Sequence, residues 1–123
     1  MTDIKLVAIC CSLTERLETV IARDNDRNYY ILTIHDARDV QVGDVLRGDF
    51  EAVLDCFRSV YCVSKKQEVK ISLECAKIPL EWAVEEFLDK TGIPTEIFFM
   101  SGNRIITDVP DKNRQIIDEI LRG

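Results

Sequence analysis

The stretch that decides the fold is "VKISLECAKIPLEWAVEEFLDKTGIP", residues 69–94, because the spacing of its apolar residues changes halfway along. In its first half, apolar and polar residues alternate, which is the period of a strand with one buried face. In its second half, the apolar positions form one helical stripe: Leu80, Ala83, Val84, Phe87 and Leu88. Pro79 suits the first turn of this helix, and Gly92 followed by Pro94 suits its end. The sequence therefore predicts a strand that passes directly into a helix over residues 80–91.

The chain before this stretch is expected to form short strands separated by polar turns. The predicted strands cover residues 4–11, 17–22, 28–34, 45–52, 57–63 and 68–75. The polar run "RDNDRN" separates the second strand from the third, as in a hairpin. Gly48 lies inside the fourth strand, where a glycine favours a bulge or the sharp bend that a small barrel needs.

The chain after the helix is expected to form a hairpin and a second helix. The run "TEIFFMSGNRIIT", residues 95–107, surrounds Gly102 and Asn103, which we interpret as a two-residue turn. Asp108 is expected to cap the last helix, with Pro110 in its first turn. This helix is expected to have an apolar stripe and a solvent-exposed face. The apolar stripe comprises Ile116, Ile117, Ile120 and Leu121, and the exposed face carries Arg114, Asp118 and Arg122.

Six strands followed by a segregated helical part indicate an α+β fold rather than a doubly wound one. We predict a small antiparallel β-barrel, SH3-like or OB-like and of about six strands, joined to a C-terminal β-α-β-β-α unit. Residues 1–75 would form the barrel lobe and residues 76–123 the helix-hairpin-helix lobe. A chain of 123 residues is short enough for both lobes to share one compact domain.

Two local resemblances accompany this prediction. Residues 69–106 resemble the short N-terminal domain of secretins and TonB-dependent receptors, and the matching positions are Pro79, Leu80, Ala83, Thr91 and Gly92. Those proteins are exported and we expect no export signal here, so the resemblance implies the strand-helix-strand fold and no signalling role. Residues 29–50 are similar to the middle of OB-like and SH3-like barrels, where a "VGD" turn leads into a strand. That likeness concerns architecture and carries no activity.

The composition favours a soluble, cytoplasmic protein. The net charge is −6, which is unfavourable for binding phosphate backbones and suits a basic protein partner better. The longest apolar run is residues 6–11, far too short to span a membrane. The five cysteines, an odd number without any C-x-x-C pair, indicate buried thiols rather than a disulfide framework.

The only histidine, His35, is followed closely by Asp36, Asp39 and Asp44. A zinc site would need further histidine or cysteine ligands, so we interpret this run as a polar connection between strands. The hairpin at residues 24–28 matches the first ligand positions of a calcium loop. Its required glycine and glutamate are Tyr29 and His35, so we expect no calcium site there.

No catalytic motif, phosphate-binding loop or zinc-protease motif occurs in the chain. A nucleophilic pair of His35 with Cys10, Cys56 or Cys62 is disfavoured because cysteines in apolar strands are usually inert. We therefore expect a protein that is not an enzyme and that needs no cofactor or metal.

Trp82, the only tryptophan, lies on the side of the predicted helix opposite its apolar stripe. Its neighbours at helical spacing are Glu85, Glu86 and Asp89. Two explanations compete. Either the barrel covers this side of the helix and buries the ring, or the ring is exposed and belongs to an interface, where tryptophan is enriched.

The sequence thus favours a non-enzymatic, acidic protein-interaction module. It would be a small inhibitory or immunity-type protein, or a protein that self-associates as a homodimer, with Trp82 in the contact. The alternative is a barrel that binds nucleic acid or a small ligand. The surface for nucleic acid would comprise three tyrosines and three lysines: Tyr29, Tyr30, Tyr61, Lys65, Lys66 and Lys70.

Overall fold

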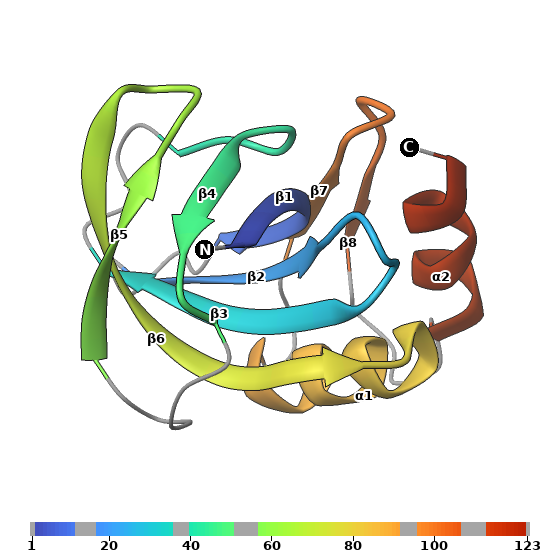
Figure 1. Cartoon of the computed structure of the whole chain (residues 1–123). Coiled ribbons are helices and arrows are strands. Elements are labelled where there is room, and N and C mark those ends of the chain that lie inside the picture. The colour runs from blue at the N-terminus through green and yellow to red at the C-terminus, as the bar shows by residue number, and fades with distance from the viewer. Residues whose placement is uncertain are drawn as a thin grey trace.

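A computed structural model describes residues 2–11, 17–35, 40–50, 57–91, 96–106 and 113–122. The elements follow the order strands, helix, hairpin, helix (Figure 1). Their bounds are β1 (Thr2–Cys11), β2 (Leu17–Arg23), β3 (Tyr29–His35), β4 (Val45–Gly48), β5 (Phe57–Cys62), β6 (Gln67–Ile78), α1 (Leu80–Thr91), β7 (Glu96–Phe99), β8 (Arg104–Ile106) and α2 (Asn113–Arg122). The predicted α+β class and the helix over residues 80–91 are confirmed.

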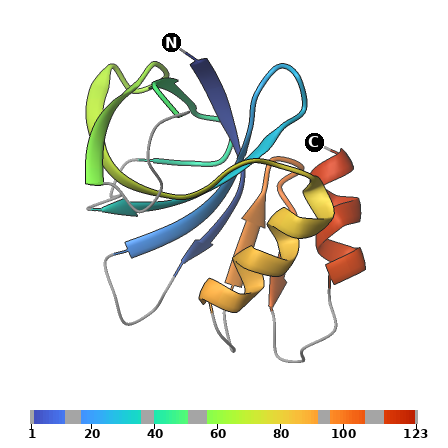
Figure 2. The ribbon, with the colours of Figure 1, turned by 60° about the horizontal axis from the view of Figure 1, so that its bottom comes forward.

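Six strands close into an antiparallel barrel in the order β1-β2-β3-β6-β5-β4, and β4 pairs back onto β1. Figure 2 shows the ring that these strands form, with both helices outside it. The barrel interior is filled by apolar side chains, with Tyr30 and Phe50 packed edge to face at 5.9 Å between ring centroids. The predicted small barrel joined to a β-α-β-β-α unit is therefore confirmed.

Strand β1 contributes side chains to two cores and contains a bulge at Val7. Leu6 and Ile9 both face the barrel, although they are three positions apart and would lie on opposite faces of a regular strand, while Val7 and Ala8 face the helices. The bulge inserts one extra residue and so changes which face each later side chain takes. This explains why residues 6–10 are all apolar, since both faces of this part of the strand are covered.

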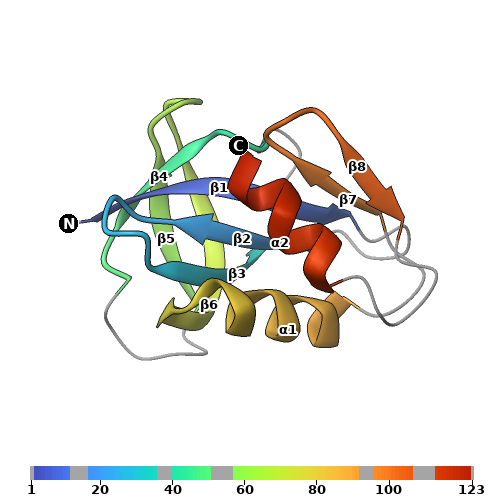
Figure 3. The same cartoon turned by 90° about the vertical axis from the view of Figure 1, so that its right-hand side faces the viewer.

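The second core lies between the sheet and the two helices. β7 pairs with the second half of β1, β8 pairs with β7, and α1 and α2 pack over this part of the sheet (Figure 3). The two helices contact each other, and α1 also contacts β2, β3 and β6. None of the described helices is long and apolar enough to cross a membrane.

The hairpin turn before β8 differs from the prediction. The amide of Gly102 donates to the carbonyl of Phe99, and the amide of Phe99 donates to the carbonyl of Asn103. The turn is therefore a three-residue loop with Gly102 at a φ of 89°, a left-handed conformation that glycine adopts easily. The predicted two-residue turn of Gly102 and Asn103 is wrong.

The buried residues of helix α2 differ from the predicted apolar stripe. Ile116, Ile117 and Ile120 are buried as expected, but Leu121 is 57% exposed, so its assignment to the apolar stripe is wrong. Glu119 takes the fourth buried place. Its Oε2 accepts hydrogen bonds from the hydroxyl of Ser101 and from the side-chain amide of Asn103, which tie α2 to the β7–β8 turn. The predicted cap at Asp108 lies outside the described residues.

Candidate functional site

Helix α1 separates a buried side from a side that nothing in the described chain covers. Its apolar stripe packs into the second core, while Trp82 stands 64% exposed on the opposite side. The explanation in which the barrel covers this side and buries the ring is therefore wrong. The helical period places Trp82 together with Glu85, Glu86 and Asp89, all exposed. These four residues are called the acidic face below.

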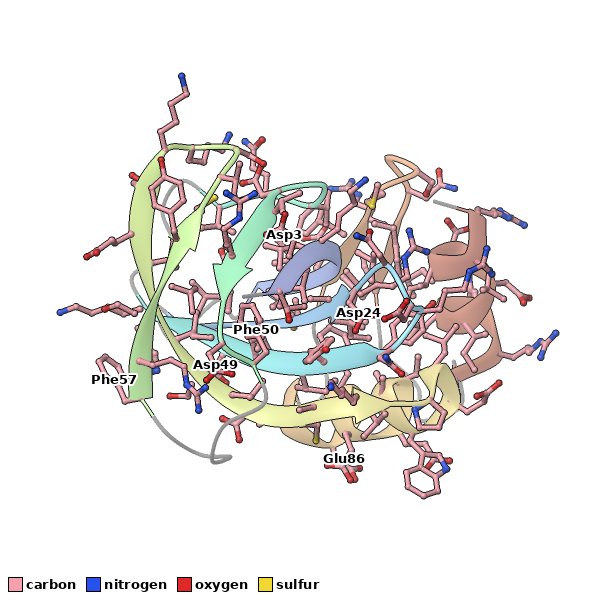
Figure 4. All side chains as sticks on the ribbon, viewed as in Figure 1. Asp3, Asp24, Asp49, Phe50, Phe57 and Glu86 are labelled. Carbon is pink, nitrogen blue, oxygen red and sulfur yellow. The ribbon has the colours of Figure 1, made fainter. Side chains whose placement is uncertain are left out.

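A hollow of about 260 Å³ opens beside the tryptophan ring. It is lined by Trp82, Glu85 and Glu86 from α1 and by Cys75 and Ile78 from the end of β6. Cys75 and Ile78 are half-buried and pack against the second core, so the lining joins an apolar base to two carboxylates. Figure 4 shows Glu86 directed away from the barrel. The acidic face is thus hollowed rather than flat.

Sequence reasoning missed Cys75 and Ile78 as members of this surface. The alternation before Cys75 placed it on the inner face of a regular strand, but β6 is irregular where it pairs with β3, with register shifts on both sides of Ile31. Lys77 has a φ of 53° in this irregular segment. The signal was Ile78, an apolar residue that belongs neither to the alternating run nor to the helical stripe.

The carboxylates of the acidic face have no cationic partner in the described part of the chain. Glu81, beside this face, is also exposed, so residues 80–89 carry four acidic side chains and no basic one. Unpaired carboxylates around an exposed indole attract cations, and the ring itself offers a cation–π surface.

A second, polar hollow of about 470 Å³ lies near the β2–β3 turn and includes Asp3, Asp24 and Arg47. Asp24 accepts hydrogen bonds from the amides of Asp26 and Asn28, from the Asn28 side chain and from the hydroxyl of Tyr30. Asp3 and Arg47 form a two-bond ion pair at 2.8 and 3.1 Å. These groups serve the fold, and the polar hairpin predicted at residues 24–28 is confirmed.

His35 lies at the end of β3. Its Nε2 is 2.9 Å from the Ser72 hydroxyl, and its ring packs on Phe57 with 4.8 Å between centroids. Asp44 holds a turn, since its carboxylate accepts from the amide of Gln41. Asp36 and Asp39 lie outside the described residues. Within the described ranges, no group of three or more histidine, cysteine or acidic side chains is placed to hold a metal.

The cysteines that the structure describes line the two cores. Cys10 is buried beneath the helices and Cys62 inside the barrel, as expected of small apolar side chains. The side chain of Cys11 and the whole of Cys56 lie outside the described part.

The surface predicted for nucleic acid is only partly present. Tyr29 is buried beneath the helices and Tyr30 lies inside the barrel, so neither ring is available for stacking. Tyr61 is 42% exposed, and Lys65, Lys66 and Lys70 are exposed on the same β5–β6 hairpin. These four residues form what is called the basic hairpin below.

The chain matches no protein-family model, and no solved structure matches it significantly. The two resemblances of residues 69–106 and 29–50 therefore stay likenesses of local pattern.

Proposed function

We propose that this chain is a non-enzymatic protein-interaction module whose acidic face binds a basic segment of a protein partner. The observation that carries the proposal is the exposure of Trp82 at the rim of a hollow flanked by unpaired carboxylates. An exposed large aromatic beside a concave apolar base is the kind of anchor that dominates protein interfaces.

The hollow suits an arginine or lysine side chain. The aliphatic stem would lie against Ile78 and Cys75, and the charged end would reach Glu85 or Glu86. The cation would at the same time lie near the indole of Trp82, within reach of a cation–π contact. Binding would then combine apolar burial with charge pairing.

The charges favour a basic partner over the symmetric homodimer expected from the sequence. A two-fold contact through this face would bring Glu85, Glu86 and Asp89 of one copy against the same residues of the other. Like charges placed across an interface are costly, whereas a basic segment would neutralise them. The buried thiols of Cys10 and Cys62 suit the reducing cytoplasm, which we propose as the place where the chain works.

Because Trp82 is the only tryptophan, its fluorescence reports directly on the acidic face. We expect a short peptide of arginine and leucine to change the emission in a saturable way at low salt, and the same peptide with glutamate for arginine to have no effect. Raising the salt should weaken binding because the charges are exposed to solvent.

The matched variants are Glu86→Gln and Asp26→Asn, two exposed carboxylates on α1 and in the β2–β3 turn. Glu86→Gln should weaken peptide binding, and Asp26→Asn should leave it unchanged. Equal losses in both variants would mean that the peptide responds to net charge alone, and the acidic face would then not be the binding site.

A further inference from the structure

The charges of the molecule are separated between its two ends. The β5–β6 hairpin, residues 57–70, carries Arg58, Lys65, Lys66 and Lys70 against the single carboxylate of Glu68. The first ten residues of α1 carry four carboxylates and no cation. A chain with a net charge of −6 therefore presents one locally basic surface and one strongly acidic surface.

These two surfaces lie far apart on the same chain. The β5–β6 turn projects at the upper left of Figure 1 and α1 lies at the lower right, and Figure 3 shows the turn at the top and α1 at the bottom. Figure 4 shows Glu86 on the side of α1 that faces away from the barrel. The two surfaces therefore meet only when they belong to different copies.

We infer that the basic segment bound by the acidic face is the β5–β6 hairpin of a second copy of this chain, in a head-to-tail contact. The inference rests on the proposed function and identifies its partner. Lys65 and Lys66 lie in the exposed turn at residues 63–66 and, like Lys70, have no ion pair with the described part of the chain. Their positive charges are complementary to the negative charges of the carboxylates around Trp82.

The shapes of the two surfaces also correspond. The hairpin turn projects from the barrel (Figure 1), and the residues beside Trp82 line a hollow. A lysine of the turn would enter the hollow between Trp82 and Glu86. Tyr61 on the same hairpin adds a second exposed aromatic that would lie at the edge of the contact.

This contact differs in symmetry from a two-fold dimer. Each copy would use its acidic face toward one neighbour and its basic hairpin toward another, so the assembly is a ring or an open chain. The surfaces are small and charged, so the association should be weak, concentration-dependent and sensitive to salt.

The experiment uses two variants of the full chain. Trp82→Ala removes the anchor of the acidic face and leaves the hairpin intact. The double variant Lys65→Glu with Lys66→Glu reverses the charge of the hairpin turn and leaves the acidic face intact. Lys5→Glu, at an exposed position on β1, is the control for reversing the charge of one lysine outside both surfaces.

In sedimentation at low salt, the wild type and the Lys5→Glu control should self-associate, and each of the two variants alone should lose at least about tenfold in association constant. An equimolar mixture of the two variants should form a 1:1 pair and nothing larger. Only one native contact is then possible, between the intact acidic face and the intact hairpin. The emission of the single remaining tryptophan, in the hairpin variant, should change on mixing.

Three results would overturn the inference. A hairpin variant that still dimerises would indicate a two-fold contact through α1. A wild type that stays monomeric but binds the arginine peptide would leave the proposed function standing and rule out the second copy as the partner. A monomeric wild type that binds single-stranded DNA, with binding lost in the hairpin variant, would assign the basic hairpin to nucleic acid.

Discussion

The hydroxyl of Tyr30 donates a 2.8 Å hydrogen bond to the carboxylate of Asp24, six residues earlier in the chain. Tyr30 is completely buried in the barrel core, and Asp24 is only 9% exposed in the β2–β3 turn. The same carboxylate accepts from the backbone amides of Asp26 and Asn28. One bond therefore ties the geometry of the turn to the packing of the barrel.

Replacing Tyr30 by Phe should lower the free energy of unfolding by about 1.5 kcal/mol, because a hydrogen bond to a charged group is lost with almost no change in volume. Chemical denaturation at neutral pH measures the difference. The control is Tyr61→Phe, which removes a hydroxyl from an exposed ring and should change little. Equal effects of the two substitutions would contradict a special role for the bond to Asp24.

The stability should fall as the pH falls below about 4, near the normal pKa of an aspartate. Burial acts to raise the pKa of Asp24, but the hydrogen bonds from Asn28, Tyr30 and Asp26 outweigh it and lower the pKa below its usual value. The hydrogen bond from Arg47 lowers the pKa of Asp3 in the same direction. A lowered pKa stabilises the fold above the unfolded-state pKa, and this contribution disappears as the pH falls through the folded-state value.

The pH dependence and the Tyr30→Phe variant test each other. The difference in unfolding free energy between wild type and variant should be constant near neutral pH and should shrink at acid pH, where Asp24 is protonated in both. Denaturant unfolding at a series of pH values measures it. A difference that stays constant down to the lowest pH would mean that the hydroxyl does not act through the charge of Asp24.

Replacing Gly48 by Ala should destabilise the barrel, although glycine is not needed there for its backbone angles. A Cβ at this position would lie 2.8 Å from Cγ1 of the buried Val60. Strand β4 pairs with β1 as far as Gly48, opposite Thr2, without a register shift. The cost should be about 1–3 kcal/mol, as for other overpacked cores. The glycine is thus required by the close approach of the Val60 side chain on β5, and the pairing of β4 with β1 contains no bulge.

A second substitution separates this clash from a backbone effect. In the Val60→Ala background, Gly48→Ala should lower the free energy of unfolding clearly less than in the wild type, because the methyl group that would clash with the new Cβ is absent. Gly102→Ala is the contrast, since its Cβ would meet nothing within 4 Å but its φ is 89°. Gly102→Ala should lower the free energy of unfolding by the same amount in both backgrounds. Thermal or denaturant melts of each glycine variant and of its own background measure these differences.

The two aromatic residues of α1 should respond in opposite ways to truncation. Phe87→Ala opens a cavity in the second core and should lower the free energy of unfolding by about 3–5 kcal/mol. Trp82→Ala, on the exposed side, should change the stability of the monomer by no more than about 0.5 kcal/mol. Melts at low protein concentration measure both, and a large loss for Trp82→Ala would mean that its ring supports the fold of the single chain.

Local patterns in the sequence were sufficient for the elements and their class. The helical stripe of Leu80, Ala83, Val84 and Phe87 predicts α1 correctly because each side chain repeats its direction every three or four residues. The alternation before Cys75 predicts most of β6 for the corresponding reason. The order of strands, helix, hairpin and helix then restricts the fold to an α+β barrel with a helical part.

Tertiary structure decided what periodicity does not contain. The bulge at Val7, the shifts in β6 and the position of Leu121 depend on which surfaces the strands and helices meet, and neighbours in space are distant in sequence. The angle of Trp82 on its helix follows from the sequence, but its exposure depends on whether a second layer covers that side. The separation of the acidic face from the basic hairpin likewise follows only from barrel closure, because the sequence orders charges along the chain and the fold distributes them over a surface.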